Sequence, residues 1–182
     1  MTQSLCRLDD FKDNCGFGLI AHTKGKANHQ LLQNAIKALT CMTHRGGVAA
    51  DGKTGDGCGL LLQKPDAYLR AVVKETLNKE LPDLYAVGAI MLNVDSDLRD
   101  QSKAIIEQEL TAQGLEIIGW REVPTDDSCL GPIAIESLPA FEQVFVAPGK
   151  ITEQNIFAAR LYMGRRKAEN LLGSDDTFHI AS

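Results

Sequence analysis

The feature that most limits how this chain can fold is the alternation of short apolar runs with segments of helical periodicity. Apolar runs of four to ten residues predict buried strands, and apolar residues spaced three and four apart predict amphipathic helices. The predicted strands are residues 15–21, 59–63, 85–94, 115–123, 143–147 and 177–180. Four helices are predicted. Asn28 caps the first, and the second has Pro65 in its first turn and runs to about Leu81. Ser96 or Asp97 caps the third, which runs to about Gln113, and Thr152 with Gln154 opens the fourth, which runs to Leu172. Alternating elements without a repeat or a linker predict one layered α/β or α+β domain.

Composition and charge exclude several classes of protein. Hydrophobic residues make up 44% and charged residues 24% of the 182 residues, which is typical of a globular domain. No apolar run approaches the length of a membrane span. The net charge is −5, and the one tight basic cluster, Arg160 with Arg165, Arg166 and Lys167, is best interpreted as a solvated helix face. We therefore expect neither a membrane nor a nucleic acid as partner.

The cysteines suggest the compartment. There are five, an odd number, with no CxxC pair and no zinc-module spacing. This usage is typical of a reducing cytoplasm, where some cysteines serve as small core residues. Residues 1–14 form a polar leader without the apolar region of a secretory signal. The histidines form no HExxH motif, so we expect no metal site.

Residues 47–54, GVAADGKT, fit the phosphate-binding pattern GxxxxGK[ST]. That loop needs a buried strand before it and a helix beginning at the lysine and threonine. Here a helix precedes the pattern, and Gly55-Asp56-Gly57 follows it. We therefore do not interpret it as a nucleotide site.

Cys15 stands where the charged leader meets the first predicted strand. A thiolate is a strong nucleophile that needs a base to form. If the leader is removed after Asn14, the α-amine of Cys15, with an ordinary pKa near 8, becomes available as that base. The alternative is a core cysteine at the start of a strand.

The order of several motifs identifies a family. DNCGFGLIAHTKGKANH is followed by a helix and then by MTHRGGVAADGKTGDGCGLLLQ, with GWREVP further on. This pattern resembles the N-terminal glutaminase domain of the large subunits of glutamate synthases, which are class II glutamine amidotransferases and N-terminal-nucleophile hydrolases. The resemblance covers residues 13 to 182.

The resemblance implies roles for particular residues. Cys15 matches the nucleophile that attacks the side-chain amide of L-glutamine, giving a thioester and ammonia before water releases glutamate. Arg45 and Gly46 match the pair that supports this nucleophile, although Arg45 could instead pair with an acid at a helix end. Gly55, Asp56 and Gly57 are expected to shape the wall beside Cys15, or to form a tight turn.

The resemblance also implies the fold: an α+β, four-layer αββα sandwich, with residues 1–14 as a propeptide and 15–182 as the N-terminal part of the amidotransferase domain. The family's oxyanion hole uses an Asn-Gly pair, and this chain has no Asn-Gly dipeptide. Losing one oxyanion donor costs ~100- to 1000-fold in turnover. We therefore expect a truncated sandwich that is inactive or nearly so alone, and that associates with itself or with a companion segment.

For the full enzyme, the resemblance implies amination of 2-oxoglutarate, with FMN, an iron-sulfur cluster and NADPH or ferredoxin lying beyond this chain, and a further chain or small subunit as partner. It implies no cofactor in residues 1–182. The alternatives are a catalytically silent interaction module and the amidotransferase domain of another class II enzyme, such as amidophosphoribosyltransferase or asparagine synthetase. The DGKTGDG loop argues against both of these enzymes.

Overall fold

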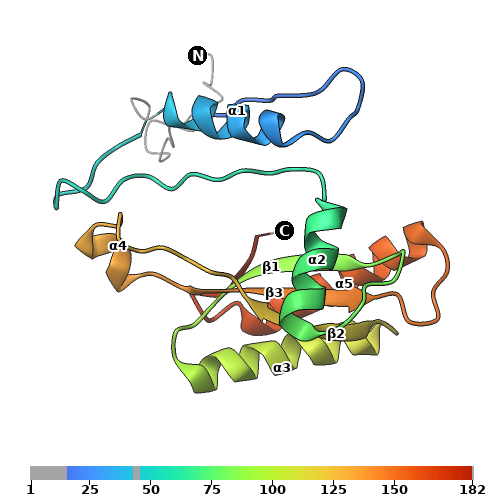
Figure 1. Ribbon diagram of the computed structural model, residues 1–182. Helices are drawn as coiled ribbons and strands as arrows, with labels where there is room; N and C mark the ends of the chain where they lie inside the picture. The colour runs from blue at the N-terminus through green and yellow to red at the C-terminus, as the bar shows by residue number, and fades with distance from the viewer. Residues whose placement is uncertain (1–15, 43–45, 182) are drawn as a thin grey trace, which may run out of the picture. The chain divides into compact units, whose positions relative to one another are not determined.

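The computed structural model describes residues 16–42 and 46–181 and divides them into two compact units (Figure 1). The described part of the smaller unit comprises residues 16–42, 46–62 and 130–133, and that of the larger unit comprises residues 63–129 and 134–181. Within each unit, the residues contact one another more than they contact the other unit.

The larger unit is built on one antiparallel sheet. Its strands are β1 (Ala86–Leu92), β2 (Glu116–Glu122), β3 (Ala140–Ala147) and β4 (His179–Ile180), in the spatial order β2-β3-β1-β4. Every pairing is antiparallel, with Val87 opposite Phe145 on β3 and Ile90 opposite Ile180 on β4. An antiparallel sheet with packed helices confirms the α+β class.

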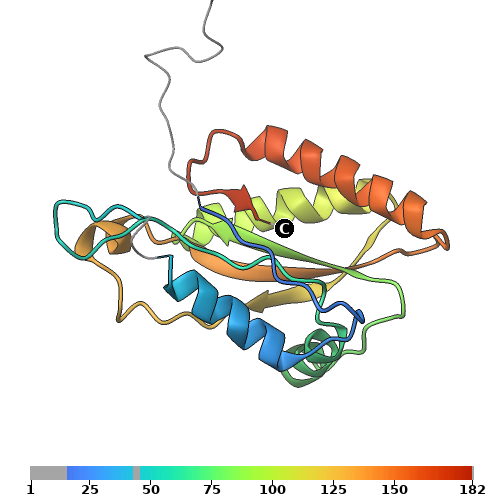
Figure 2. The same ribbon diagram turned by 90° about the horizontal axis from the view of Figure 1, so that it is seen from above.

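Helices α3 (Ser96–Ala112) and α5 (Gln154–Leu172) lie side by side on one face of this sheet (Figure 2). They enclose the main core, whose buried residues are Ile90, Leu92, Ile106, Leu110, Leu115, Val144, Val146, Phe157, Ala168, Leu172 and Ile180. Gly164 allows the two helices to approach closely, because a Cβ there would lie 2.9 Å from Cδ2 of Leu110.

The opposite face of the sheet carries α2 (Asp66–Leu77). A second buried cluster joins the helix to the sheet and contains Leu69, Val73, Leu81, Tyr85 and Phe145. Side chains alternate between the two faces of a strand, so Ala89, Met91, Phe141 and Gln143 share the α2 face with Phe145. They are half-buried and belong to neither core cluster, so α2 covers only part of this face.

The smaller unit contains α1 (His29–Thr40). Asn28 caps this helix as predicted, since its Oδ1 accepts a hydrogen bond of 2.7 Å from the backbone N–H of Gln30. None of the residues of α1 is buried. The amphipathic face predicted for this helix is therefore open within the described residues.

Two of the predicted strands are wrong over the residues that the structure describes. Residues 16–21 and 59–63 adopt no strand, and Phe17, Leu19 and Leu61 are about nine-tenths exposed, at 92%, 89% and 91%. A strand requires a neighbour for its backbone hydrogen bonds, and among the described residues no segment pairs with either run. The second sheet of the four-layer sandwich therefore stays a prediction.

Other boundaries differ in detail. Asp95, and not Ser96 or Asp97, caps α3, because its carboxylate accepts from the N–H groups of Asp97 and Leu98. The helix predicted to run to about Leu81 ends at Leu77, where Asn78 takes a left-handed conformation. The short helix α4 (Pro132–Glu136) was not predicted. The end of α5 at Leu172, before Gly173, is confirmed.

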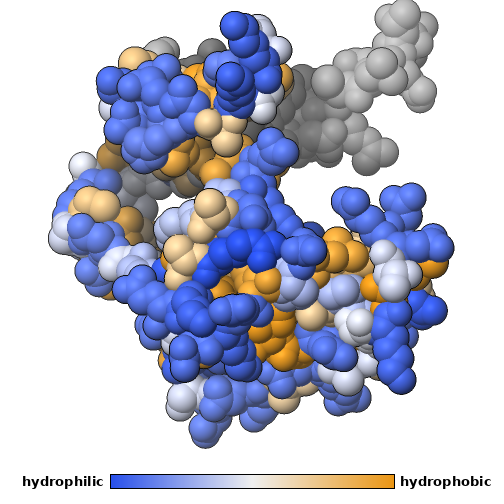
Figure 3. Space-filling model, turned by 45° about the vertical axis from the view of Figure 1, so that its right-hand side comes forward, coloured by the Kyte–Doolittle hydropathy of each residue, from blue (hydrophilic) through white to orange (hydrophobic). Residues whose placement is uncertain are grey.

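Hydrophobic residues are also visible at the surface. On the face seen in Figure 3, they form the floor of a hollow with a hydrophilic rim.

None of the helices in the described ranges has both the length and the apolar character needed to cross a bilayer.

Candidate functional site

The candidate site is the glycine-rich loop at residues 46–57, in the smaller unit. Val48 and Gly55 form an isolated antiparallel bridge. Within it, the N–H of Ala49 donates to the Thr54 carbonyl over 2.7 Å, and the N–H of Gly52 donates to the Ala49 carbonyl over 3.0 Å. Gly52 has a φ of +68°, which glycine adopts without strain. The loop is therefore a small closed hairpin.

Asp51 is the centre of this hairpin. Its Oδ1 accepts hydrogen bonds from the backbone N–H groups of Lys53 at 3.0 Å and Thr54 at 2.8 Å. Its Oδ2 accepts from the Thr54 hydroxyl at 2.5 Å. The hydrogen bond from the Thr54 hydroxyl and those from the two backbone N–H groups favour the ionised form and hold the pKa of Asp51 well below its ordinary value.

A segment of the same unit that lies far along the sequence contacts the carboxylate of Asp51. The N–H of Ile133 donates to Oδ2 of Asp51 over 3.3 Å. A Cβ at Gly131 would lie 2.6 Å from Oδ2 of Asp51 and 2.5 Å from the backbone nitrogen of Thr54. Only glycine leaves room for this approach, so Asp51 joins residues 51–54 to residues 130–133.

Asp56, one of the predicted wall residues, fastens the start of the loop. Its Oδ2 accepts from the N–H of Gly47 over 2.7 Å, and its own N–H donates to the Gly47 carbonyl over 3.3 Å. Gly55 takes part in the bridge, and Gly57 is exposed. This geometry agrees with a tight turn. It also fixes the backbone of Gly47, the residue directly after Gly46.

The structure places only part of the predicted catalytic set. Cys15 and Arg45 lie outside the described residues, and Gly46 is exposed on the loop. Cys41, Cys58 and Cys129 are exposed free thiols. Across residues 16–42 and 46–181, no group of three or more His, Cys, Asp or Glu side chains could hold a metal ion.

The pattern GxxxxGK[ST] lacks the flanking strand and helix of a phosphate-binding loop among the described residues. Residues 47–54 lie in a hairpin preceded by α1, and no helix begins at Lys53 or Thr54. Neither the central position of Asp51 nor the need for glycine at residue 131 is predicted from the sequence. An Asp-Gly turn was a usable signal for Asp51, whereas nothing in the sequence connects Gly131 to a loop 77 residues earlier.

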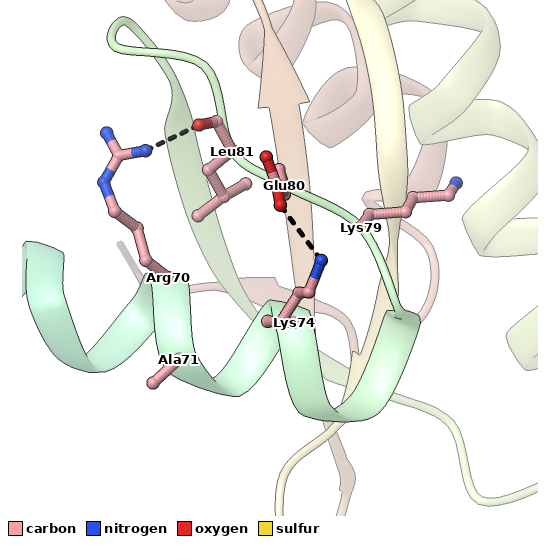
Figure 4. A pocket seen from close by; sticks show the side chains of 6 residues that line it. All are labelled: Arg70, Ala71, Lys74, Lys79, Glu80 and Leu81. Carbon is pink, nitrogen blue, oxygen red and sulfur yellow. Dashed lines mark hydrogen bonds and ion pairs between the residues drawn. The ribbon is translucent and has the colours of Figure 1, made fainter.

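Two of the hollows in the described part of the larger unit are candidates for a site. One, of about 400 Å³, lies between α2 and the segment after it and is lined by Arg70, Lys74, Lys79, Glu80 and their neighbours (Figure 4). Its cations are already engaged: Arg70 donates to the Leu81 carbonyl at 2.5 Å, Lys74 pairs with Glu80 at 3.0 Å, and Lys79 donates to the Ile118 carbonyl. The other, of about 290 Å³, is apolar and lies between the sheet and helices α3 and α5. Neither presents a catalytic group.

Known proteins similar to this chain identify its family. Residues 15–182 match the family model described as "Glutamine amidotransferases class-II". The large chain of NADPH glutamate synthase from Bacillus subtilis is 40% identical over 92% of this chain and 11% of its own length. Ferredoxin-dependent glutamate synthase 2 from Synechocystis is 36% identical over 87% of this chain, and NADH glutamate synthase from Schizosaccharomyces pombe is 31% identical over 94%. The chain spans about a tenth of the length of these relatives.

Proposed function

Since this chain belongs to the class II glutamine amidotransferases, we propose that it is the glutaminase part of a glutamate synthase and hydrolyses L-glutamine to glutamate and ammonia. The observation that carries this proposal is the position of the family match, which begins at Cys15, the residue that the sequence analysis assigned as nucleophile. The relatives named above are all glutamate synthases, which supports this role.

The proposed chemistry needs residues 1–14 to be removed as a propeptide. The freed α-amine of Cys15 takes the thiol proton, and the thiolate forms a bond to the amide carbon of glutamine. The carbon–nitrogen bond then breaks, and the α-ammonium returns the proton to the departing ammonia. Water, deprotonated by the same amine, cleaves the thioester and releases glutamate. In this proposal, the protein acts as an N-terminal-nucleophile hydrolase.

In this proposal, Arg45 and Gly46 hold the backbone and amine of Cys15. The geometry of the adjoining loop supports this role. Asp56 fixes the N–H of Gly47, the residue after Gly46, and Asp51 holds the tip of the same hairpin. A loop fixed at both points positions a neighbouring arginine with less loss of conformational entropy. Gly55, Asp56 and Gly57 then form the wall of the glutamine pocket.

We also propose the four-layer αββα sandwich for the complete domain. Two observations support it. Helix α2 leaves part of one sheet face half-buried, and residues 17–20 and 60–62 carry exposed apolar side chains without strand partners. In a four-layer sandwich, strand pairing would satisfy the backbones of these two runs, and a second sheet would cover the half-buried face.

In the longer relatives, this domain is one part of a larger polypeptide. We therefore propose that its ammonia aminates 2-oxoglutarate during nitrogen assimilation in the cytoplasm, with FMN and an iron-sulfur cluster held by other domains or by a small subunit. The printed names of the relatives give NADPH, NADH or ferredoxin as donor, so the donor is left unassigned. The alternatives, a silent interaction module and another class II enzyme, are not favoured.

The test is covalent labelling of the mature protein with a glutamine analogue that carries a diazoketone in place of the amide. Mass spectrometry should show an N-terminus at Cys15 and a single adduct on that residue, which excess L-glutamine prevents. Cys58→Ser, which removes an exposed thiol, should label normally, and Cys15→Ser should not label. A processed protein whose Cys15 stays unlabelled, or labels no faster than Cys58, would refute the assignment.

A further inference from the structure

Arg121, in the larger unit, has a buried side-chain donor without a partner among the described residues. It lies on β2 opposite Gln143 of β3, and its Nη1 donates to Oε1 of Gln143 over 2.8 Å. Its Nε is buried and has no hydrogen-bond partner. Among the side-chain nitrogen and oxygen atoms of the described residues, this is the one buried atom without a partner. A buried donor that loses its water and gains no acceptor destabilises the fold.

In three other arginines of this unit, Nε lies near a carboxylate oxygen. The Nε of Arg70 lies 2.8 Å from Oδ2 of Asp66, and the Nε of Arg165 lies 2.7 Å from Oε1 of Glu169. The Nε of Arg99 faces Oε1 of Glu142 at 3.8 Å. Each of these three guanidinium groups turns its Nε toward a carboxylate, and Arg121 does not.

The free donors of Arg121 form a matched pair. Because Nη1 is used by Gln143, the edge that remains consists of Nε and Nη2, and neither has a hydrogen bond among the described residues. Two parallel N–H groups on one edge of a guanidinium match the two oxygens of a carboxylate. We propose that Arg121, positioned by Gln143, is a carboxylate-binding residue on the part of the sheet face that α2 leaves uncovered.

The surroundings favour this ligand. Phe141 and Phe145 flank Gln143 on the same face of β3, and apolar neighbours strengthen a charged hydrogen bond by lowering the local dielectric constant. The nearest acidic side chains on these strands point away. Glu142 faces α3, where it pairs with Lys103, and Glu122 follows Arg121 and so points to the face opposite to it. The carboxylate must come from elsewhere.

Two sources share this chemistry: a small carboxylate ligand, and an Asp or Glu side chain of the polypeptide that covers this face. The test is nitrogen-15 NMR of the arginine Nε–H groups in the 182-residue chain, titrated with sodium acetate or sodium glutamate and, at equal ionic strength, with sodium sulfate. A small-ligand site predicts a saturable shift at Arg121 with acetate or glutamate but not with sulfate. A polypeptide source predicts a slowly exchanging Arg121 Nε–H before any addition, with fast exchange after acidification.

Two arginines serve as internal controls. Arg165 should stay unchanged because Glu169 already occupies its Nε, and the exposed Arg160 reports non-specific binding. Arg121→Lys keeps the positive charge but loses the two parallel N–H donors of the guanidinium group. It should weaken acetate binding by about tenfold or more. Gln143→Leu should weaken it less. The proposal is overturned if the Arg121 Nε–H exchanges rapidly and ignores acetate and glutamate, or if it responds no more than Arg160.

Discussion

The hydroxyl of Tyr85 donates a hydrogen bond of 2.8 Å to Oδ1 of Asp66 and so joins the residue before β1 to the first turn of α2. The other carboxylate oxygen of Asp66 holds Nε of Arg70 at 2.8 Å. Lys64 lies 3.7 Å from the centre of the Tyr85 ring, and its ammonium donates to the Tyr85 carbonyl. This cluster fixes the first turn of α2 against the sheet. Leu69 and Val73, which follow on the same helix, are buried against the sheet as well.

Replacing Tyr85 with phenylalanine should therefore destabilise the larger unit. Tyr85→Phe keeps the buried ring but removes the donor to Asp66, so the free energy of unfolding should fall by about 1 kcal/mol in urea titration. Tyr68→Phe is the matched control, because Tyr68 is on the same helix and is 56% exposed. Equal effects of the two substitutions would contradict the role given to this hydrogen bond.

The same cluster predicts a dependence on alkaline pH. Burial, and then the hydrogen bond to Asp66, raise the pKa of Tyr85 from 10.0 to about 12. The unfolded chain loses this proton near 10 and the folded chain near 12. The stability that Tyr85 contributes is thus complete below pH 10 and is lost as pH rises through 12. Thermal unfolding from pH 9 to 12 should show a steeper loss for the wild type than for Tyr85→Phe.

Replacing Asp51 with alanine should loosen the glycine-rich loop without unfolding the larger unit. The carboxylate accepts hydrogen bonds from Lys53, Thr54 and Ile133, so in Asp51→Ala the amides of these residues should exchange with solvent about tenfold faster. Asp127→Ala, in an exposed segment, should leave them unchanged. In the wild type, the lowered pKa of Asp51 should keep these amides protected below pH 3.8, with protection lost only as pH falls through the folded pKa.

Gly131→Ala should separate residues 130–133 from the loop. The new Cβ would come within 2.6 Å of Oδ2 of Asp51, so the backbone must move and the Ile133 amide should lose its protection from exchange. Gly57→Ala is the control, since a Cβ at residue 57 meets nothing within 4 Å. Unchanged exchange at Ile133 in Gly131→Ala would show that the close approach does not exist in solution.

Glu142 and Lys103 should be energetically coupled. Glu142 is 8% exposed on β3, and its Oε2 lies 2.8 Å from Nζ of Lys103 on α3. Removing Lys103 leaves a buried carboxylate with a more distant Arg99, at 3.8 Å. Urea titration of Lys103→Met, Glu142→Gln and the double variant should give a coupling energy between about 0.5 and 3 kcal/mol. Additive losses would contradict this coupling.

Prediction from sequence was most accurate where the pattern is local. Strands β1, β2 and β3 and the last helix were predicted within a few residues, because alternation and helical periodicity depend on neighbours along the chain. It was wrong at residues 16–21 and 59–63. Glycine-rich apolar runs satisfy the pattern of a strand, but whether they form one depends on a partner strand that no local signal supplies.

For the candidate site, the sequence alone determined the family and the glycine-rich character of residues 46–57, because these are properties of residue identity and order. The role of Cys15 as nucleophile stays a prediction. The tertiary structure decided that Asp51 joins this loop to residues 130–133, that Gly131 must lack a side chain, and that the buried Nε of Arg121 has no hydrogen-bond partner among the described residues. These three facts depend on segments that are far apart in the chain or on neighbouring strands. Their contacts arise from packing and hydrogen-bond geometry, which the order of residues does not display.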